Sequence, residues 1–266
     1  MRHLNTLCLA LLLCLGCAGC GNKYYSAPLE GEVPLAYGPS KGTLYVRSEV
    51  GAGRIWLPTA LATLNYEITE REGGLLWRVE ARGRYLGLKD GKAVRPDSLD
   101  GVFKLYPLTE SHEPLFFTVR TDRRGNVETM GDPTSIAKGT PLPQPFWKQY
   151  YRSLFSSVFI PFSADKARMD AVVSHAQSCL LPQDSLHFPA SDIVLAGKQE
   201  AFGDTGLVLH YENQSREYKN SNRQKCTDSV EVDMVIDAQT CIPVNGRAIY
   251  TGVNGRRYIF ISREEK

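Results

Sequence analysis

The sequence predicts an α+β fold: a curved, mostly antiparallel β-sheet, arranged as a meander or half-barrel, with a central pair of covering helices. Apolar residues alternate with polar ones between residues 43 and 130, change to helical spacing between residues 145 and 178, and return to alternation after residue 191. Alternation is typical of half-buried strands, and a spacing of three to four residues is typical of an amphipathic helix. We therefore expect a single β-rich domain over residues 43–266, interrupted by two helices.

The N-terminus has the pattern of a secretory signal peptide over residues 1–19. Arg2 supplies a positive charge, Leu7–Leu15 is an uncharged apolar stretch, and small residues follow at Gly16, Ala18 and Gly19. The apolar stretch holds nine residues, whereas a transmembrane helix needs about 20. We expect a cleaved leader rather than a membrane span.

The leader ends in Cys17, Ala18, Gly19 and Cys20, which resembles the lipobox of bacterial lipoproteins. The resemblance implies acylation of Cys20, with palmitate among the expected chains and Cys17 as the alternative site. Two or more chains anchor a protein firmly, because each buried CH₂ contributes about 0.8 kcal/mol. Gly21 follows, where lipoproteins retained at the inner membrane typically carry Asp. The resemblance therefore implies a periplasm-facing protein of the outer membrane.

Residues 20–42 are predicted to form an acylated, flexible tether, since Pro28, Pro34 and Pro39 fall among glycines with little periodicity. Removing residues 1–19 from the 266 leaves 247 residues, enough for one large domain, and the loss of Arg2 lowers the formal charge from +2 to +1. This balance gives no electrostatic case for nucleic acid. The expected partners are the membrane, through the anchor, and a lipid or an envelope protein.

The clearest hairpin joins residues 62–68 to residues 75–81 around the turn Glu72, Gly73, Gly74. Weaker strands are expected at residues 84–88, 102–108 and 115–121. After residue 191, strands are expected at residues 193–195, 198–202, 207–218, 230–236, 246–251 and 257–261. Asn254 and Gly255 are a hairpin-turn signal between the last two.

Two helices are expected between these groups of strands. The first, near residues 145–160, carries six aromatic residues: Phe146, Trp147, Tyr150, Tyr151, Phe155 and Phe159. Pro145 suits its first turn and Pro161 ends it. The second, near residues 164–178, has Ser163 as N-cap and an apolar stripe of Met169, Val172, Val173 and Ala176.

One face of the first helix cannot bury all of its aromatic side chains. We therefore take five residues as candidates for lining an apolar ligand site, with core packing as the alternative: Trp147, Tyr150, Tyr151, Phe155 and Trp77. A meander divided by aromatic helices resembles half-barrel periplasmic carriers of lipids and lipoproteins, and other bacterial lipoproteins, in the order of elements over residues 43–261. In the carriers the concave face binds acyl chains.

Three cysteines remain in the domain once the leader and Cys20 are set aside: Cys179, Cys226 and Cys241. In an oxidising periplasm this number suits one disulfide and one free thiol. A hairpin after residue 236 would separate Cys226 from Cys241 by roughly 30 Å. We therefore expect a disulfide between Cys179 and either Cys226 or Cys241.

Few residue patterns indicate catalysis. His175 and Cys179 would share a face of the second helix, and His210 and Glu212 would share a face of a strand, where they are candidates for acid–base chemistry. A nucleophile elbow, an HExxH motif, a phosphate-binding loop and a dinucleotide fingerprint are absent from the sequence. We expect no cofactor, no metal site and no catalytic residue.

The expected function is that of a membrane-tethered periplasmic lipoprotein that binds an apolar ligand or an envelope partner without catalysis. The alternatives are an envelope assembly or scaffold component and, third, a hydrolase built around His175 or His210.

Overall fold

The computed structural model describes residues 27–52, 55–86, 88–89, 92–93, 105–107, 115–132, 134–135, 155–156, 158–176, 191–201, 204–215, 217–219, 222–252 and 255–263. Strands make up 67% of the described residues, and every named element among them is a strand. The molecule is therefore nearly all β in the described residues.

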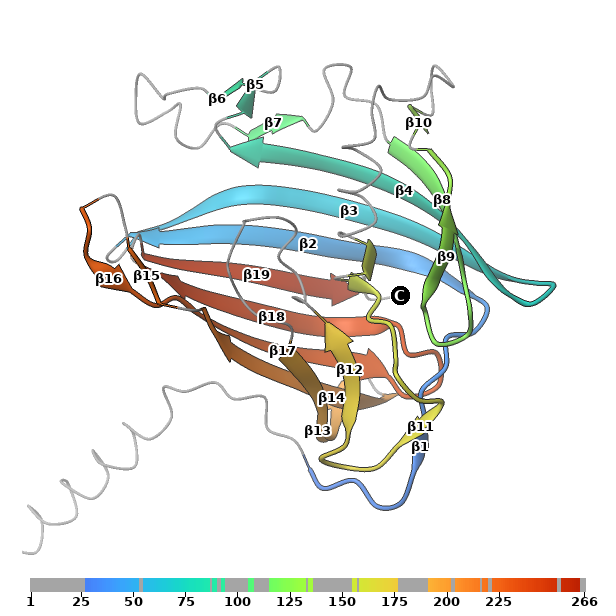
Figure 1. Cartoon of the computed structure of the whole chain (residues 1–266). Coiled ribbons are helices and arrows are strands. Elements are labelled where there is room, and N and C mark those ends of the chain that lie inside the picture. The colour runs from blue at the N-terminus through green and yellow to red at the C-terminus, as the bar shows by residue number, and fades with distance from the viewer. Residues whose placement is uncertain are drawn as a thin grey trace, which may run out of the picture.

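Most of the strands belong to one antiparallel sheet. Its spatial order is β10 (Thr134–Ser135), β8 (Leu115–Thr121), β4 (Gly74–Leu86), β3 (Ile55–Arg71), β2 (Ser40–Ala52), β19 (Gly255–Arg263), β18 (Pro243–Gly252), β17 (Ser229–Asp237), β14 (Asp204–Gln214), β13 (Ser191–Ala201) and β12 (Val172–Ala176), with β7 (Leu105–Pro107) beside β4 and β9 (Val127–Met130) beside β8. Figure 1 shows β2 and β19, from the two ends of the chain, side by side at its centre.

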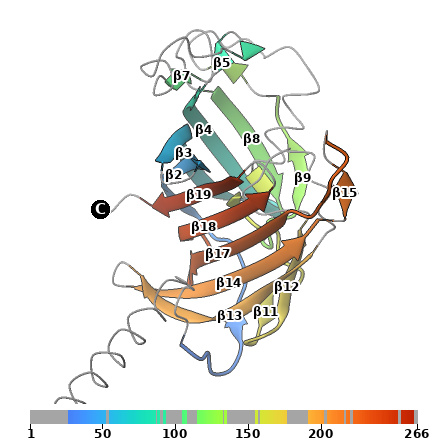
Figure 2. The same ribbon diagram turned by 90° about the vertical axis from the view of Figure 1, so that its left-hand side faces the viewer.

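Three small two-stranded sheets complete the named elements. They pair β1 (Val33–Pro34) with β11 (Lys166–Ala167), β5 (Leu88–Lys89) with β6 (Lys92–Ala93), and β15 (Tyr218–Lys219) with β16 (Lys225–Cys226). Figure 2 shows that the large sheet curves, so that β8 and β9 near one end and β12 at the other lie on the same side.

The predicted hairpins form because their sequences alternate. In β3 and β4, Leu64, Tyr66 and Ile68 are buried and face Ala81, Val79 and Trp77, which are buried as well. Gly73 makes the turn between them with φ +82°, a conformation that glycine adopts without a steric cost. The hairpin of β18 and β19 is also present, with Gly252 opposite Gly255.

The aromatic core fills the concave side of the sheet. Trp77 lies at its centre, with ring centroids 5.2 Å from Tyr37, 5.0 Å from Phe155 and 4.7 Å from Phe159. The indole Nε1 of Trp77 donates a hydrogen bond of 2.8 Å to Oγ1 of Thr121, so its polar atom is satisfied inside the core.

The prediction of two covering helices, and with it the α+β class, is wrong. Residues 145–154, most of the first predicted helix, lie outside the described residues. Its described end has helical backbone at residues 155, 156 and 158, and the Phe159 N–H donates a 2.8 Å hydrogen bond to the Phe155 carbonyl. Val158, Phe159 and Ile160 are all buried although they are consecutive. Consecutive buried residues do not fit the single apolar stripe of an amphipathic covering helix, and no helix is among the named elements of the described residues.

The second predicted helix is replaced by β11 and β12. Val172 is 39% exposed whereas Val173 is fully buried, as expected for neighbours on a strand. Both valines are β-branched, which favours a strand when a partner is present. That partner is β13, whose Val194 lies opposite Val172.

Residues 27–42, assigned to the tether from the sequence, belong to the folded domain. Leu35 and Tyr37 are fully buried in the core. The Leu35 N–H donates a 2.8 Å hydrogen bond to the Asp165 carbonyl, and the Tyr37 hydroxyl donates a 3.0 Å hydrogen bond to the Ile160 carbonyl. The described chain is therefore part of the fold from Ala27 onward.

Candidate functional site

Three polar residues form a row across β14, β17 and β18 on the face opposite the core. His210 lies directly opposite Asp233, and Asp233 lies directly opposite Arg247. Their strand neighbours Tyr211 and Val232 belong to the core. Since successive residues of a strand point to opposite faces, the three polar side chains share the other side, called here the outer face.

Asp233 is the centre of this row, although it is only 4% exposed. Its Oδ2 accepts hydrogen bonds from Nε and Nη2 of Arg247 at 3.1 and 2.9 Å, and its Oδ1 lies 2.8 Å from Nδ1 of His210. A buried carboxylate needs such charged partners to offset the loss of its hydration. The three side chains therefore hold one another in a fixed arrangement.

A second row consists of Glu212 on β14 and Glu231 on β17, each two residues along its strand from His210 or Asp233. It is called the acidic row. Glu212 and Glu231 are directly opposite each other, which is unfavourable for like charges. Nε2 of His210 lies 3.4 Å from Oε1 of Glu212, and Nη2 of Arg247 lies 3.8 Å from Oε1 of Glu231. Arg247, together with His210 when it is protonated, thus offsets part of the repulsion between the two glutamates.

The pKa of His210 is raised above its ordinary value of 6.5. The hydrogen bond to Asp233 is the largest cause; partial burial opposes it, and the charges of Asp233, Glu212 and Glu231 add to it. Among the described side chains, three carboxylates face two cations when His210 is protonated, which leaves an excess of one negative charge. With His210 neutral, the excess is two.

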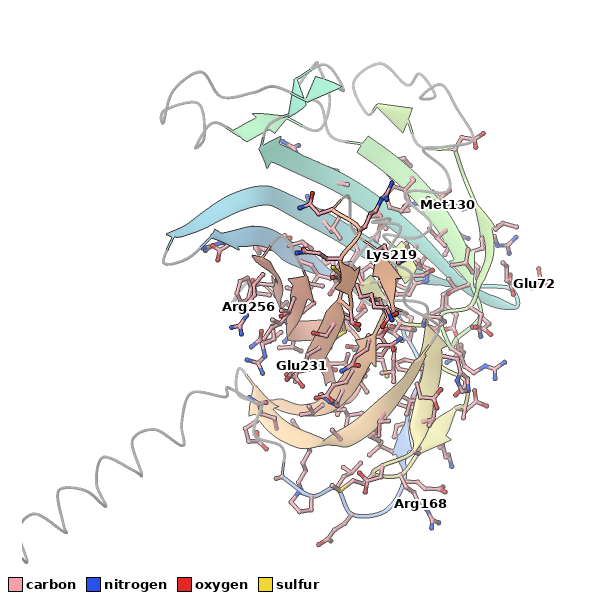
Figure 3. All side chains as sticks on the ribbon, turned by 60° about the vertical axis from the view of Figure 1, so that its left-hand side comes forward. Glu72, Met130, Arg168, Lys219, Glu231 and Arg256 are labelled. Carbon is pink, nitrogen blue, oxygen red and sulfur yellow. The ribbon has the colours of Figure 1, made fainter. Side chains whose placement is uncertain are left out.

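A cavity of about 480 Å³ is bounded in part by the acidic row. This volume is typical of sites for small ligands or for a projecting group of a larger partner. Figure 3 shows Glu231 on this part of the sheet. The lining residues are Glu212, Asn213, Gln214, Ser229, Val230, Glu231, Ile249 and Thr251.

The arrangement does not suit His210 as a general base. Both ring nitrogens of His210 face carboxylates, Asp233 on one side and Glu212 on the other. This favours the doubly protonated imidazolium, which has no lone pair available to act as a general base. The carboxylates, hydroxyls and amide groups that line the cavity are hydrogen-bond acceptors for a protonated amine, and the excess negative charge favours the same group.

The structure places two of the predicted apolar-site residues in the core. Trp77 and Phe155 are 0% and 2% exposed, and their rings pack edge to face. Trp147, Tyr150 and Tyr151 lie outside the described residues. A role for these five residues in lining a ligand site stays a prediction.

The structure describes two of the three cysteines that the disulfide prediction concerns. Cys226 and Cys241 are free thiols in the structure. Cys241 is buried, and burial raises its pKa to about 12. Cys179, the expected disulfide partner, lies outside the described residues, as do the lipidation site Cys20 and its alternative Cys17.

The two candidate histidines have different surroundings. His175 lies on β12 rather than on a helix, so the helical spacing expected between it and Cys179 does not apply at its position. Its Nδ1 lies 2.6 Å from Oδ1 of Asp192 on an exposed surface. The structure does place His210 and Glu212 on one face, as alternation predicts.

Asp233 and Arg247 were missed by sequence reasoning. The alternation of Val230, Val232, Met234 and Ile236 places Asp233 on the outer face, but it does not show that this face is buried there. Arg247 meets Asp233 only through the register of β17 with β18, which the sequence does not specify.

The described part of the chain contains neither a membrane-spanning helix nor a group of metal ligands. None of its segments is a helix with the length and hydropathy needed to cross a bilayer. In the same residues, no three side chains of His, Cys, Asp or Glu are grouped as metal ligands.

Comparisons with known proteins do not assign a family. No protein-family model matches the sequence, and no curated protein is similar to it. Among solved structures, Aeromonas veronii immune modulator A aligns with 10% sequence identity and a TM-score of 0.17, over 87% of this chain and 96% of that chain. A likeness of this size supports no conclusion about function.

Proposed function

We propose that this chain is a lipid-anchored protein of the bacterial cell envelope, on the periplasmic side of the outer membrane, and that it binds a partner without catalysis. The leader and the lipobox-like residues that end in Cys20 support the anchor. The charge cluster and cavity on the outer face support the binding role. The partner is an envelope component that presents a protonated amine.

One observation carries the choice of partner: Glu212 and Glu231 lie directly opposite each other beside the cavity. Two carboxylates at this spacing repel each other, so a cation between them lowers the electrostatic energy of the site. Asp233 fixes Arg247 and His210 behind the pair, so the site is pre-organised and loses little conformational entropy when it binds.

An apolar ligand is supported less well by the described residues. The concave side of the sheet is filled there by the protein's own aromatic rings, including Trp77 and Phe155. A dry cavity large enough for an acyl chain would need those rings to lie apart.

A scaffold that pairs through the β12 end of the sheet is also supported less well. One edge of β13 pairs with β14. The other edge is covered by β12 and by Ala27, which exchanges two hydrogen bonds with Lys198. At β12, the Val173 carbonyl accepts a 2.8 Å hydrogen bond from the Ser163 N–H. Covered edges of this kind do not recruit another strand.

Photo-crosslinking from the cavity in intact cells tests the proposed function. With p-benzoylphenylalanine in place of Thr251, which lines the cavity, we expect a discrete crosslinked species that E231Q abolishes. The matched control is E67Q, which removes an exposed carboxylate of β3 that lies 3.5 Å from Arg78 and outside the cavity lining, and which should leave the species unchanged.

A small amine provides a readout that does not depend on a captured protein. The detergent-solubilised full chain is titrated with cadaverine, and binding is followed by calorimetry. We expect saturable binding that E231Q weakens by about tenfold or more, because a hydrogen bond to a charged group contributes about 1.5–3 kcal/mol. Equal affinities of wild type, E231Q and E67Q would refute the site.

A further inference from the structure

The N-terminal part of the folded chain is fixed to the sheet at Ala27. The Ala27 N–H donates a 2.8 Å hydrogen bond to the Lys198 carbonyl, and the Lys198 N–H donates a 2.9 Å hydrogen bond to the Ala27 carbonyl. This pair attaches the chain to the middle of β13. The position of Ala27 relative to the domain is therefore set by the fold.

Only six residues, 21–26, separate Ala27 from Cys20. Each residue of a fully extended chain spans at most about 3.3–3.6 Å, so the seven steps from Cys20 to Ala27 reach about 25 Å at most. If Cys20 is acylated as in the proposed function, on which this inference rests, Ala27 cannot lie further than that from the membrane surface.

The surface around Ala27 is polar and exposed. Arg168, just after β11, has a side chain that is 75% exposed and lies 3.3 Å from Glu32. Lys166 and Lys198 are exposed as well. Charges of both signs are compatible with lipid headgroups but not with the hydrocarbon interior. This end of the domain therefore suits contact with the bilayer surface without insertion.

The cavity lies at the other end of the same strands. Lys198 is directly opposite Leu207 on β14, and Gln214, which lines the cavity, is seven residues further along that strand. At about 3.3 Å per residue the separation is about 23 Å. Figure 3 shows Arg168 at one end of the molecule, with Glu231 and Arg256 well separated from it.

We propose that the end of the domain formed by Ala27, Lys198 and the β1–β11 pair rests on the lipid headgroups, and that the cavity faces away from the membrane. The partner then approaches from the periplasm rather than from within the bilayer. With the cavity end at the bilayer, the linker would have to be almost fully extended, because its reach of about 25 Å barely exceeds the separation of about 23 Å. Full extension costs conformational entropy, so the short linker, not a specific lipid-binding pocket, biases the domain toward the proposed orientation.

Crosslinking to lipid tests the orientation. The acylated full chain is placed in vesicles of phosphatidylethanolamine and phosphatidylglycerol, with p-benzoylphenylalanine in place of Arg168 or, as a control near the cavity, of Arg256. The control position is exposed and lies opposite Thr251. We expect at least about fivefold more lipid adduct from position 168, because the short linker gives that end a high effective concentration at the bilayer. Equal yields would overturn the proposed orientation.

A longer linker separates the effect of the tether from any intrinsic affinity for lipid. Inserting about 40 Gly and Ser residues after Ser26 raises the root-mean-square linker span to roughly 35 Å, and the yields at the two positions should become equal. A bias that persists would overturn the role of the linker. Vesicle flotation and intact mass report acylation separately. If the unaltered chain neither floats with the vesicles nor carries the added mass of acyl chains, the anchor is refuted as well. If it floats but positions 168 and 256 crosslink lipid equally, the orientation alone is refuted.

Discussion

Replacing Asp233 with asparagine (D233N) should destabilise the domain strongly. Asp233 is 4% exposed, and its carboxylate accepts two hydrogen bonds from Arg247 and faces Nδ1 of His210. The variant keeps the shape of the side chain but removes its charge. The guanidinium of Arg247, whose side chain is 14% exposed, then loses its closest counter-charge.

The expected loss follows from the burial of the partner that is left behind. Breaking a buried ion pair by removing one partner costs about 3–5 kcal/mol. Arg247 keeps Glu231 at 3.8 Å, which offsets part of this cost. We therefore expect D233N to lower the free energy of unfolding by about 3 kcal/mol, the lower end of that range.

Urea unfolding followed by circular dichroism measures this loss, and D192N is the matched control. Asp192 also faces a histidine, with Oδ1 2.6 Å from Nδ1 of His175, but the two side chains are 55% and 66% exposed. Exposed pairs contribute about 0–1 kcal/mol. If D233N and D192N cost the same small amount, the claim that the outer-face cluster is a buried, structural unit is refuted.

The same variant should remove a pH dependence. Because the folded-state pKa of His210 is raised above 6.5, the stability from its charged form is fully present below pH 6.5 and is lost as the pH rises through the folded-state pKa. D233N removes the largest cause of the raised pKa. We expect the NMR titration of His210 to move toward 6.5, and the decline of stability above pH 6.5 to become shallower; an unchanged titration would contradict the assignment.

Two further predictions concern the core. G125A should lose about 1–3 kcal/mol more stability than G73A. Both glycines have positive φ, but a Cβ at Gly125 would lie 2.7 Å from Cε2 of Tyr37, whereas a Cβ at Gly73 would meet open space. Equal losses of stability in urea unfolding would contradict this packing. In the native protein, Cys241 should resist iodoacetamide at pH 8 because a pKa of about 12 leaves it almost no thiolate, while Cys226 reacts. Peptide mapping that found Cys241 labelled first would contradict its burial.

Local patterns predicted the strands well. The alternation of Val230, Val232, Met234 and Ile236 placed these residues on one buried face, as the structure shows. The hairpin around Gly73 was also predictable, because its turn and both strands lie within one short stretch. Such features depend on neighbours in sequence, which periodicity reports directly.

Features that depend on distant contacts were not predictable in this way. The apolar spacing at Val172 and Val173 fits a helix or a strand, and pairing with β13 decided between them. Leu35 and Tyr37 looked like part of a proline-rich tether, but they are buried by the core that the rest of the chain builds.

The same distinction explains what could be predicted of the site. His210 and Glu212 share a face by local alternation, and the structure confirms that they do. Asp233 and Arg247 join them only through the register of β14, β17 and β18. A pairing register is a tertiary property, because a shift of one residue would move Asp233 to the opposite face.

The proposed anchor is tested most directly by the mass of the mature N-terminal peptide, isolated from bacterial membranes. The account predicts that the protein begins at Cys20 and that this residue carries covalently bound acyl chains. An N-terminus at Cys17 would shift the anchor by three residues and lengthen the linker to Ala27 accordingly. A mature protein that begins elsewhere, or an unmodified Cys20, would contradict the proposed anchoring.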